Sequence, residues 1–459
     1  MVACFIMEKV LDHLEELDQL IDQGRELDII RLISAFHPAD IADVIDALDE
    51  EKKKRLFGLL QVETAADVIM EIDEISRELI VEDISPDKLT QIVDDMESDD
   101  ATDLIGELPQ EQAQRILSHI DKVDSEEVQE LLKYDKETAG GIMQLELVAV
   151  PQGVSVRDAI EQIRSSAGEV EDLHNVFIVD DGEKLVGVLP LRKLILASPE
   201  HRIEAIMDAA TIMVTPEVDQ EEVAEVFRKY DIVSLPVVDK AGTLLGRIMV
   251  DDVVDVIEQE DSEDIMKMAG IPEEDLVYGS SIVAISRVRL PWLLTNLFGG
   301  LLTGYLMWLF RIALHEVIAL VTFIPVITAM GGNIGIQSST IMIRGFATGR
   351  VDFNNLGRVL FKEIKIGCLM GIACGVVAGC AAVLWHKDPF LGPIVALAMI
   401  IAITTAASMG TLIPAFFKKV KIDPAIAAGP FVTTANDIVG IVIYLGIATL
   451  FLKFLVAQP

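Results

Sequence analysis

The sequence is short of cysteine, histidine and basic residues. Among its 459 residues there are 4 Cys, 7 His and 37 Lys+Arg, against 74 Asp+Glu. Cys4 is isolated and the other cysteines lie in one apolar stretch, which excludes a secreted disulfide scaffold. There is no HExxH motif and no CxxC pair, so zinc and copper have no obvious ligand set. The shortage of basic residues excludes a nucleic-acid partner, because phosphate contacts need a basic surface.

The charges are segregated along the chain. From Arg287 onward there are 13 basic and 6 acidic residues, whereas residues 1–286 hold 24 basic and 68 acidic residues. An acidic half with a net charge of −44 therefore precedes an apolar half with a net charge of +7. The sequence contains no P-loop, metallohydrolase motif or nucleophile–base pair, so it does not predict an enzyme.

The apolar half, residues 285–459, is expected to cross a membrane five times, because a helical span needs about 20 apolar residues. The five segments are 290–310, 317–343, 366–385, 391–417 and 425–452. Basic residues gather before the first span, between the second and third, and between the fourth and fifth. The positive-inside rule then predicts a multi-pass membrane protein with its N-terminus in the cytoplasm and its C-terminus outside, and the plasma membrane is its expected location. The acidic first 18 residues predict no signal peptide.

Residues 1–135 are expected to form an acidic, all-α domain. Apolar residues recur at spacings of three and four, and the unit ADVI at 42–45 returns at 66–69 and, as TDLI, at 102–105. Pro38, Pro86 and Pro109 separate the units. The pattern indicates short helices stacked in a small superhelical domain.

Residues 136–255 contain a duplicated α/β unit. A predicted helix at 154–164 and a strand–turn–strand at 175–191 recur as a helix at 218–228 and strands at 234–250. The two copies resemble a tandem CBS pair, a regulatory module that commonly binds adenine nucleotides or ions.

An acidic connector helix is expected at 251–275, between the CBS pair and the first span. It carries eight carboxylates between residues 251 and 264. Like charges at this density repel one another. One interpretation is a solvated acidic surface; a sharper hypothesis is that a divalent cation relieves the repulsion.

Asp437 is the one charged residue between Asp423 and Lys453, near the middle of the fifth span. A carboxylate at the bilayer centre costs roughly 2.5–3.5 kcal/mol. No Lys or Arg lies deep in another span, so a cation is its expected partner; a protonated, hydrogen-bonded Asp is the alternative. Nearby hydroxyls, amides and carbonyls suit a hard cation such as Mg²⁺, which keeps most of its waters. A twofold dimer would bring two such carboxylates together.

The order of these parts, with the motifs PVITAMGGNIGIQSS at 325–339 and GPFVTTANDIVG at 429–440, resembles the MgtE family of magnesium channels over essentially the whole chain. The resemblance implies a multidomain membrane protein: an all-α superhelical N-terminal domain, an α/β tandem CBS pair, an acidic plug helix and a five-helix α transmembrane domain. It implies a homodimer whose pore is built from the second and fifth spans of both protomers. A hydrated Mg²⁺ would lie at Asp437, framed by Gly429 and Thr433; some relatives carry Asn where this chain has Gly429.

The resemblance also implies a sensor. Mg²⁺ bound between acidic faces of the N-terminal domain, the CBS pair and the plug helix would hold the pore shut. The acids at the matching positions are Asp67, Asp99, Glu221, Asp231, Asp252, Asp255, Glu260, Glu263, Asp264 and Asp423.

Other functions stay open at this point. The chain could be a channel or a coupled carrier for Co²⁺, Mn²⁺ or Ca²⁺, which flux competition would distinguish. It could also be a membrane-anchored ion sensor without flux, although an anchor needs no carboxylate at mid-membrane. An adenine nucleotide is a secondary candidate ligand: the second CBS copy has Gly246 and Asp252, whereas the first has Gly187 followed by the basic pair Arg192-Lys193, which could meet phosphates.

Overall fold

The computed structural model describes residues 14, 16–166, 170, 173–209, 212–271 and 282–451. The chain divides into two compact units, Met1–Ile257 and Glu258–Pro459, and each is described by itself. The start of the predicted N-terminal domain, residues 272–275 of the predicted connector and the end of the predicted fifth span lie outside the described residues.

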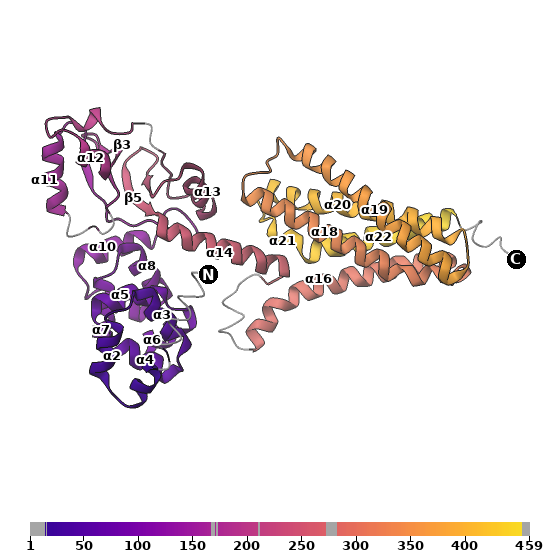
Figure 1. Cartoon of the computed structure of the whole chain (residues 1–459), viewed down its shortest axis with the longest axis horizontal. Helices are drawn as coiled ribbons and strands as arrows, with labels where there is room; N and C mark the ends of the chain where they lie inside the picture. Colours follow the sequence, from indigo (N-terminus) through magenta and orange to yellow (C-terminus); the bar gives the residue numbers. More distant parts are fainter. Residues whose placement is uncertain are drawn as a thin grey trace. The chain divides into compact units, whose positions relative to one another are not determined.

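The N-terminal part of the first unit consists of short helices that pack on their second neighbours along the chain (Figure 1). Helix α3 packs on α5, α5 on α7 and α7 on α9, while α4 packs on α6 and α8 on α10. This stacking confirms the expected helical domain. The helices are α2 (Glu26–Ile33), α3 (Pro38–Ala47), α4 (Glu50–Gly58), α5 (Val62–Glu71), α6 (Glu74–Asp83), α7 (Pro86–Asp94), α8 (Ser98–Glu107), α9 (Gln110–Leu117) and α10 (Lys122–Leu131).

The sequence repeat falls at equivalent places in these helices. The units at 42–45, 66–69 and 102–105 lie in α3, α5 and α8, and the last two residues of each are buried in one core. The helices begin where the sequence provides caps: the side chains of Asp49, Asp73 and Ser85 each accept a hydrogen bond from the amide three residues on. Burial of the repeated apolar pair thus explains why the helices stack.

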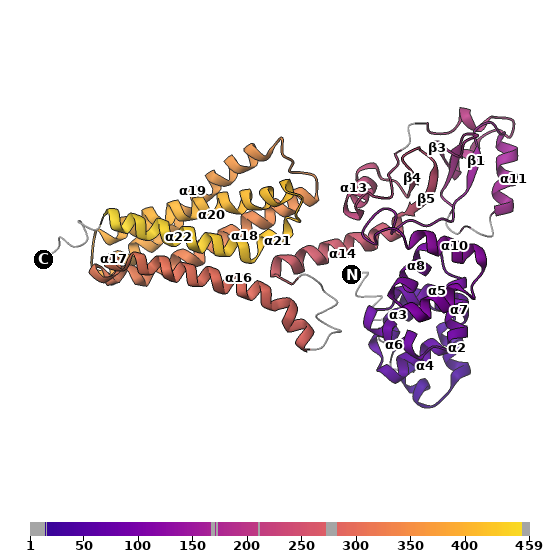
Figure 2. The ribbon, with the colours of Figure 1, turned by 180° about the vertical axis from the view of Figure 1, so that it is seen from behind.

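The part expected to be a CBS pair contains two similar α/β copies, seen from behind in Figure 2. The first has β1 (Ala149–Pro151), α11 (Val156–Ser166), β2 (Asn175–Val179), β3 (Leu185–Pro190) and α12 (Leu191–Leu196). The second has α13 (Gln220–Tyr230), β4 (Ser234–Val238), β5 (Leu244–Met249) and the start of α14 (Val250–Ala269). A short 3₁₀ turn, Ile203–Ala205, lies between them.

The two copies match in detail. Each hairpin pairs antiparallel, with a register irregularity at Ile178/Val179 in one and at Val237/Val238 in the other. Gly187 and Gly246, which the repeat aligns, both lie under a methionine: a Cβ at either would approach the sulfur of Met207 or Met143 within 2.8 or 3.1 Å. The duplication predicted from the sequence is therefore present in the structure.

The second unit begins within α14 and contains five helices that are long and apolar enough to span a membrane, counted over the described residues. They are α16 (Ile282–Leu309), α18 (Ile324–Ala347, extended by a 3₁₀ segment from Ile318), α19 (Leu356–His386), α20 (Leu391–Lys419) and α22 (Pro430–Leu450). The short helices α17 (Arg311–Glu316) and α21 (Ala425–Ala428) lie between them. The predicted number of spans is confirmed, and so is the fold class.

The third span corrects the sequence prediction, because α19 begins ten residues before the predicted start at 366. Charged residues in its first three turns lowered the apparent hydropathy there. The helix packs on α20 through Gly367, Gly371, Gly375 and Gly379, four residues apart. Added Cβ atoms at these glycines would lie within about 3 Å of the α20 backbone or its alanine side chains, so the two helices approach closely, as small residues allow in membranes.

Candidate functional site

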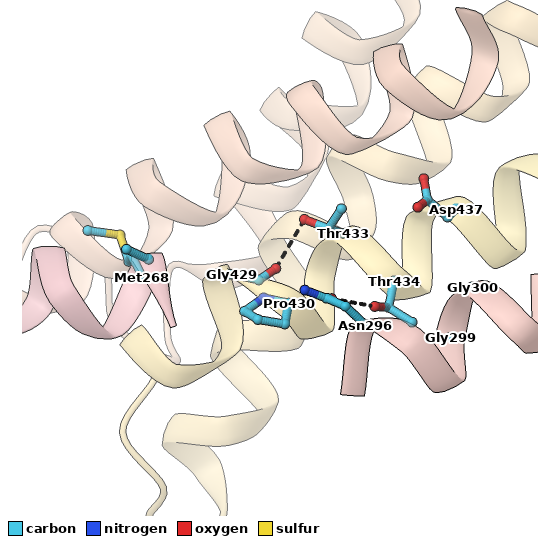
Figure 3. A pocket seen from close by; sticks show the side chains of 10 residues that line it. Met268, Asn296, Gly299, Gly300, Gly429, Pro430, Thr433, Thr434 and Asp437 are labelled. Atoms are coloured by element: carbon cyan, nitrogen blue, oxygen red, sulfur yellow. Dashed lines mark hydrogen bonds between the residues drawn. The ribbon is translucent and has the colours of Figure 1, made fainter. Parts of the chain in front are cut away.

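The fifth span opens on a glycine–proline pair beside a cavity. Pro430 is the first residue of α22, and the hydroxyl of Thr433 donates a hydrogen bond to the carbonyl oxygen of Gly429 at 3.1 Å. The cavity has a volume of about 320 Å³, with Asp437 at one end and Met268 at the other (Figure 3). Its lining comes from the end of α14, from α16 and from α22: Met268, Ala269, Asn296, Gly299, Gly300, Gly429, Pro430, Thr433, Thr434 and Asp437.

Asp437 is half-buried and lines this cavity. Within the part of the chain that the structure describes, no basic side chain forms an ion pair with it and no group donates a hydrogen bond to its carboxylate. An isolated carboxylate in a membrane helix is costly and marks a functional site by default. The arrangement can therefore accept a cation, with the hydroxyl of Thr433 and the carbonyl of Gly429 one to two turns away.

Gly429 touches the connector helix directly. A Cβ added to it would lie 2.5 Å from the carbonyl oxygen of Met268, so any side chain here would displace the end of α14. The position can contribute only main-chain atoms to the cavity. This gives a physical reason for the glycine that the sequence alone did not explain.

A lysine neutralises the acids at the end of the connector helix. Lys267 Nζ lies 2.5 Å from a carboxylate oxygen of Glu263 and 2.8 Å from one of Asp423. Burial opposes the charge of Lys267, but the hydrogen bonds to Asp423 and Glu263 outweigh it and raise the pKa of the ammonium group. Burial, and then the charge of Asp423, raises the pKa of Asp264 to about 6. The predicted acids Glu263, Asp264 and Asp423 are therefore brought together, but around the ammonium group of Lys267, which the sequence analysis missed. The i,i+4 spacing of Glu263 and Lys267 could have indicated this ion pair.

A second ion pair lies beside it. The guanidinium of Arg344, near the end of α18, contacts the carboxylate of Asp261 at 2.5 Å. The pair borders a further cavity of about 240 Å³ that is also lined by Asp264, Met268 and residues of α18. The last turns of α14 are therefore held to the membrane helices by two charge pairs and by the packing of Met268 on Ile343 and Ala425.

In the first unit the structure brings Asp99 and Asp252 together. Asp99 is buried on α8, and burial followed by the charge of Asp252 raises its pKa well above the ordinary value. Burial, and next the charge of Asp251, raises the pKa of Asp252 to about 8, although the amide of Met249 donates to it. The pKa of Asp100 is raised to about 7 by burial and then by the charge of Glu97. Asp252 and Asp100, with pKa values near neutrality, can hold protons that a divalent cation could replace.

Two other predicted acids have acidic neighbours. Partial burial, and then the charge of Asp95, raises the pKa of Asp67. Burial, and next the charge of Asp255 on α14, raises the pKa of Glu71, a residue that the sequence analysis did not single out. The N-terminal helices and the start of α14 therefore present facing carboxylates, as the connector hypothesis requires.

The remaining predicted acids are spread out. Glu221 lies in the first turn of α13, whereas Asp231 caps its other end with a left-handed backbone (φ 51°). Ten residues of helix separate them by about 15 Å, so they cannot bind one ion directly together. Glu260 lies on α14 one turn before Glu263. Across the described residues, no three His, Cys, Asp or Glu side chains converge on a preformed metal site.

The sequence reasoning also missed a buried carboxylate in the third span. Glu363 is 6% exposed, and the hydroxyl of Ser338 on α18 donates a hydrogen bond to it at 2.8 Å. The predicted span began after this residue, which removed it from view. On α22 the amide of Asn436 is 2% exposed, packs against Gly335 of α18 and has no hydrogen-bond partner among the described residues. The second and fifth spans are therefore in direct contact through small and polar residues.

The first CBS copy contains a basic cavity of about 320 Å³. It is lined by Arg192, Lys193, Leu196, Ala197, His201 and Ile206, and Lys193 also pairs with Asp208 at 2.5 Å. The basic pair noted in the sequence thus lies on a concave surface.

Comparisons with known proteins cover the whole architecture. A divalent cation transporter family model matches residues 324–447, an MgtE intracellular N domain matches 36–137, and CBS domains match 139–200 and 203–259. Proteins named magnesium transporter MgtE are similar over most of their length: the Bacillus subtilis protein is 33% identical over 95% of this chain and 96% of its own. The Enterococcus faecalis protein is 39% identical over 96% of both chains. The chain belongs to the MgtE family.

Solved structures of a magnesium transporter's soluble part and of an MgtE cytosolic domain cover about half of this chain. The soluble part of a magnesium transporter has a TM-score of 0.50 and 31% identity, covering 55% of this chain and 99% of that one. The cytosolic domain of the Mg²⁺ channel MgtE in complex with ATP has a TM-score of 0.51 and 32% identity, covering 53% and 99%. The family and fold class predicted from the sequence are thus confirmed.

Similarity to enzymes is confined to the CBS part. The inosine-5′-monophosphate dehydrogenase of Aquifex aeolicus is 30% identical over only 28% of this chain. The MgtE relatives are transporters, and with its five candidate spans this family member is a multi-pass membrane protein.

Proposed function

We propose that this chain is a Mg²⁺ channel that mediates magnesium uptake and is closed by cytosolic Mg²⁺. The observation that carries the proposal is Asp437, a half-buried carboxylate without a basic partner among the described residues, facing a cavity lined by hydroxyl, amide and main-chain groups. The names of the relatives, magnesium transporters, support Mg²⁺ as the ion.

Permeation uses the hydrated ion. The cavity offers one carboxylate rather than a cage of acids, which suits Mg²⁺ held through its own waters. We place two Asp437 carboxylates on the axis of a homodimer, with the second and fifth spans of both protomers forming the pore and Gly429 and Thr433 framing the ion. With the N-terminus in the cytoplasm and the C-terminus outside the plasma membrane, a potential of 100 mV favours entry of a divalent ion by about 4.6 kcal/mol.

Closure uses the acidic half. Mg²⁺ bridging Asp99 and Asp252, or the facing acids Glu71 and Asp255, would relieve the repulsion that, after burial, raises the pKa values of Asp99 and Glu71. Asp67, Glu221, Asp231 and Glu260 are further candidate ligands. Ions at Glu263, Asp264 and Asp423 would fix the end of α14 against the cavity, where Met268 and Ala269 already form one wall.

The free energy required is modest. Moving a gate from 1:99 to 99:1 takes about 5.5 kcal/mol of differential binding. Four ions that each bind the closed form about tenfold better supply roughly 1.4 kcal/mol apiece. Several weak sites between facing acids are therefore sufficient, and closure should depend steeply on Mg²⁺ concentration.

Mg²⁺ flux into liposomes containing the purified chain tests both parts. We expect uptake that falls as internal Mg²⁺ rises, and loss of Mg²⁺ uptake in Asp437→Asn. Asp388→Asn, in the connection between the third and fourth spans, is the matched control and should behave as wild type. Equal uptake by Asp437→Asn and wild type would contradict the proposed path.

The gate has its own test in the same vesicles. Combined neutralisation of Asp252, Asp255 and Glu263 should leave the channel open at millimolar internal Mg²⁺. Glu258→Gln is the control, because its exposed side chain lies on the same helix but is not among the proposed ligands. Closure of the triple variant at the wild-type concentration would refute the sensor.

Competition in these assays also decides among ions. Co²⁺ and Mn²⁺ permeation is tested by their ability to reduce Mg²⁺ uptake, and a proton- or sodium-coupled carrier by dependence of uptake on those gradients. An adenine nucleotide is a secondary candidate ligand, since a related cytosolic domain was solved with ATP and the basic cavity at Arg192 and Lys193 could meet phosphates. Calorimetry with ATP on the wild type and Arg192→Ala tests it.

A further inference from the structure

The first membrane span contacts the fifth at a notch one helical turn before Asp437. The hydroxyl of Thr434 on α22 donates a hydrogen bond to the side-chain oxygen of Asn296 on α16 at 3.1 Å (Figure 3). The methyl group of Thr434 fills the space where a side chain of Gly299 would be, so that even one added carbon there would overlap it. Gly299 and Asn296 therefore form a polar notch into which Thr434 fits.

The orientation of the Thr434 hydroxyl differs from that of several other threonine hydroxyls in the membrane helices. Those of Thr303, Thr404, Thr433 and Thr449 each donate to the carbonyl oxygen four residues earlier in their own helix. Such a hydrogen bond satisfies the hydroxyl within its own helix and does not connect that helix to a neighbour. Thr434 instead makes a hydrogen bond to a neighbouring helix, which fixes the rotation of α22 against α16.

The rest of this contact lies on the same stripe of α16. Trp292 packs edge-on against Phe431 with ring centroids 6.1 Å apart, and Trp292, Asn296 and Gly299 follow at the i, i+4, i+7 spacing of one helix face. Most of α16 is otherwise exposed in the isolated chain. The notch is thus the polar part of a small contact. Polar groups in a membrane helix are costly, so they are usually present because they have partners or a function.

We propose that Asn296 and Gly299 are positioning residues for the cation path: they hold Thr434, and through the first turns of α22 they set the position of the Asp437 carboxylate. The inference rests on the proposed function, which assigns the ion to Asp437. Asn296, Gly299 and Gly300 line the same cavity as that carboxylate, so the first span is a wall of the path as well as a support. The first span is therefore a determinant of affinity for the divalent cation, in addition to the second and fifth.

The test separates affinity from the amount of working protein. Initial Mg²⁺ uptake is measured against external Mg²⁺ in liposomes holding the full chain, for Thr434→Val, Asn296→Ala and the double variant. Loss of one hydrogen bond predicts a half-saturating Mg²⁺ concentration about three- to tenfold higher, with maximal uptake per folded protein unchanged. The double variant should be no worse than the single ones, because both remove the same bond. A general packing defect would instead lower the maximal uptake and leave half-saturation unchanged.

Two further variants keep the result interpretable. Thr434→Ser retains the hydroxyl and should keep the wild-type half-saturation even if Thr434→Val folds poorly. Thr449→Val, on the same helix, removes a hydroxyl that bonds only within that helix and should have no effect. Wild-type half-saturation in both Thr434→Val and Asn296→Ala, while Asp437→Asn abolishes uptake, would overturn this inference alone. Unchanged uptake in Asp437→Asn would instead overturn the proposed function.

Discussion

The contacts of Lys267, at the end of the connector helix, lead to a prediction about closure of the channel in the absence of Mg²⁺. In Lys267→Met the apolar stem remains but the ammonium group that contacts Glu263 and Asp423 is lost. The side chains of Lys267, Glu263 and Asp423 are 19%, 33% and 31% exposed, so these ion pairs are partly buried. Fully exposed ion pairs contribute up to about 1 kcal/mol, and disrupting a buried pair costs about 3–5 kcal/mol. With that discount for solvent, we expect the closed arrangement to weaken by about 1–2 kcal/mol, which is a 5- to 30-fold fall in the closed-to-open ratio.

Single-channel recording at internal Mg²⁺ chelated below the closing range measures this ratio directly from dwell times. At millimolar internal Mg²⁺ the variant should still close, because a divalent ion can take the place of the ammonium group between the same carboxylates. The charge reversal Lys267→Glu should be more severe, and adding Asp423→Lys should restore the pair in opposite order. Recovery in the double variant would identify the contact rather than the net charge as the cause.

Lys421→Met is the matched control. It removes the same charge two residues from Asp423, and its side chain is exposed. If Lys267→Met leaves the dwell-time ratio at the wild-type value, or if Lys421→Met lowers it equally, the assigned role of Lys267 is wrong.

Two other predictions follow from buried carboxylates. Asp252 and Asp100 have pKa values raised to about 8 and about 7, so the metal-free first unit binds protons that its unfolded chain does not; its stability falls as the pH rises from about 4 to 8. Mg²⁺ binding at pH 7 should then release about one proton per chain from Asp252, and fewer at pH 9.5; calorimetry in buffers of different ionisation enthalpy measures this, and equal release at both pH values would contradict it. In the third span, Glu363→Gln keeps an acceptor for the Ser338 hydroxyl and should change the stability of the protein in detergent little. Glu363→Ala removes the acceptor and should lower the free energy of unfolding by about 1–3 kcal/mol. Equal losses in both variants, measured by unfolding in detergent, would show that the hydrogen bond is not the cause.

The sequence specified most of the architecture because its signals are periodic. The repeated apolar pair of the N-terminal helices, the duplicated hairpins and the five apolar runs are local patterns, and each corresponds to a packed element in the structure. Asp437 was also visible, since one charge in an apolar span is conspicuous.

What the sequence did not reveal depends on contacts between distant segments. Lys267 counted only as one positive charge on an acidic helix, because its partner Asp423 lies 156 residues further on. Asn296 and Gly299 look ordinary in an apolar span until Thr434 is placed against them. Glu363 was missed for a different reason: the charges around it moved the predicted start of the span past it.

Some acids of the proposed gate already hold protons or pair with basic side chains, and this bears on how Mg²⁺ can act. The pKa of Asp252 is raised to about 8, so that it holds a proton near neutral pH, while Lys267 and Arg344 pair with the acids at the end of α14. Mg²⁺ must therefore replace protons and compete with ammonium and guanidinium groups rather than fill bare sites. The free energy that Mg²⁺ contributes to closure is therefore the difference between two neutralised states. This difference is smaller than the repulsion expected from a net charge of −44. A gate built on such differences can respond to changes in free Mg²⁺ near its working concentration, because neither state is overwhelmingly favoured.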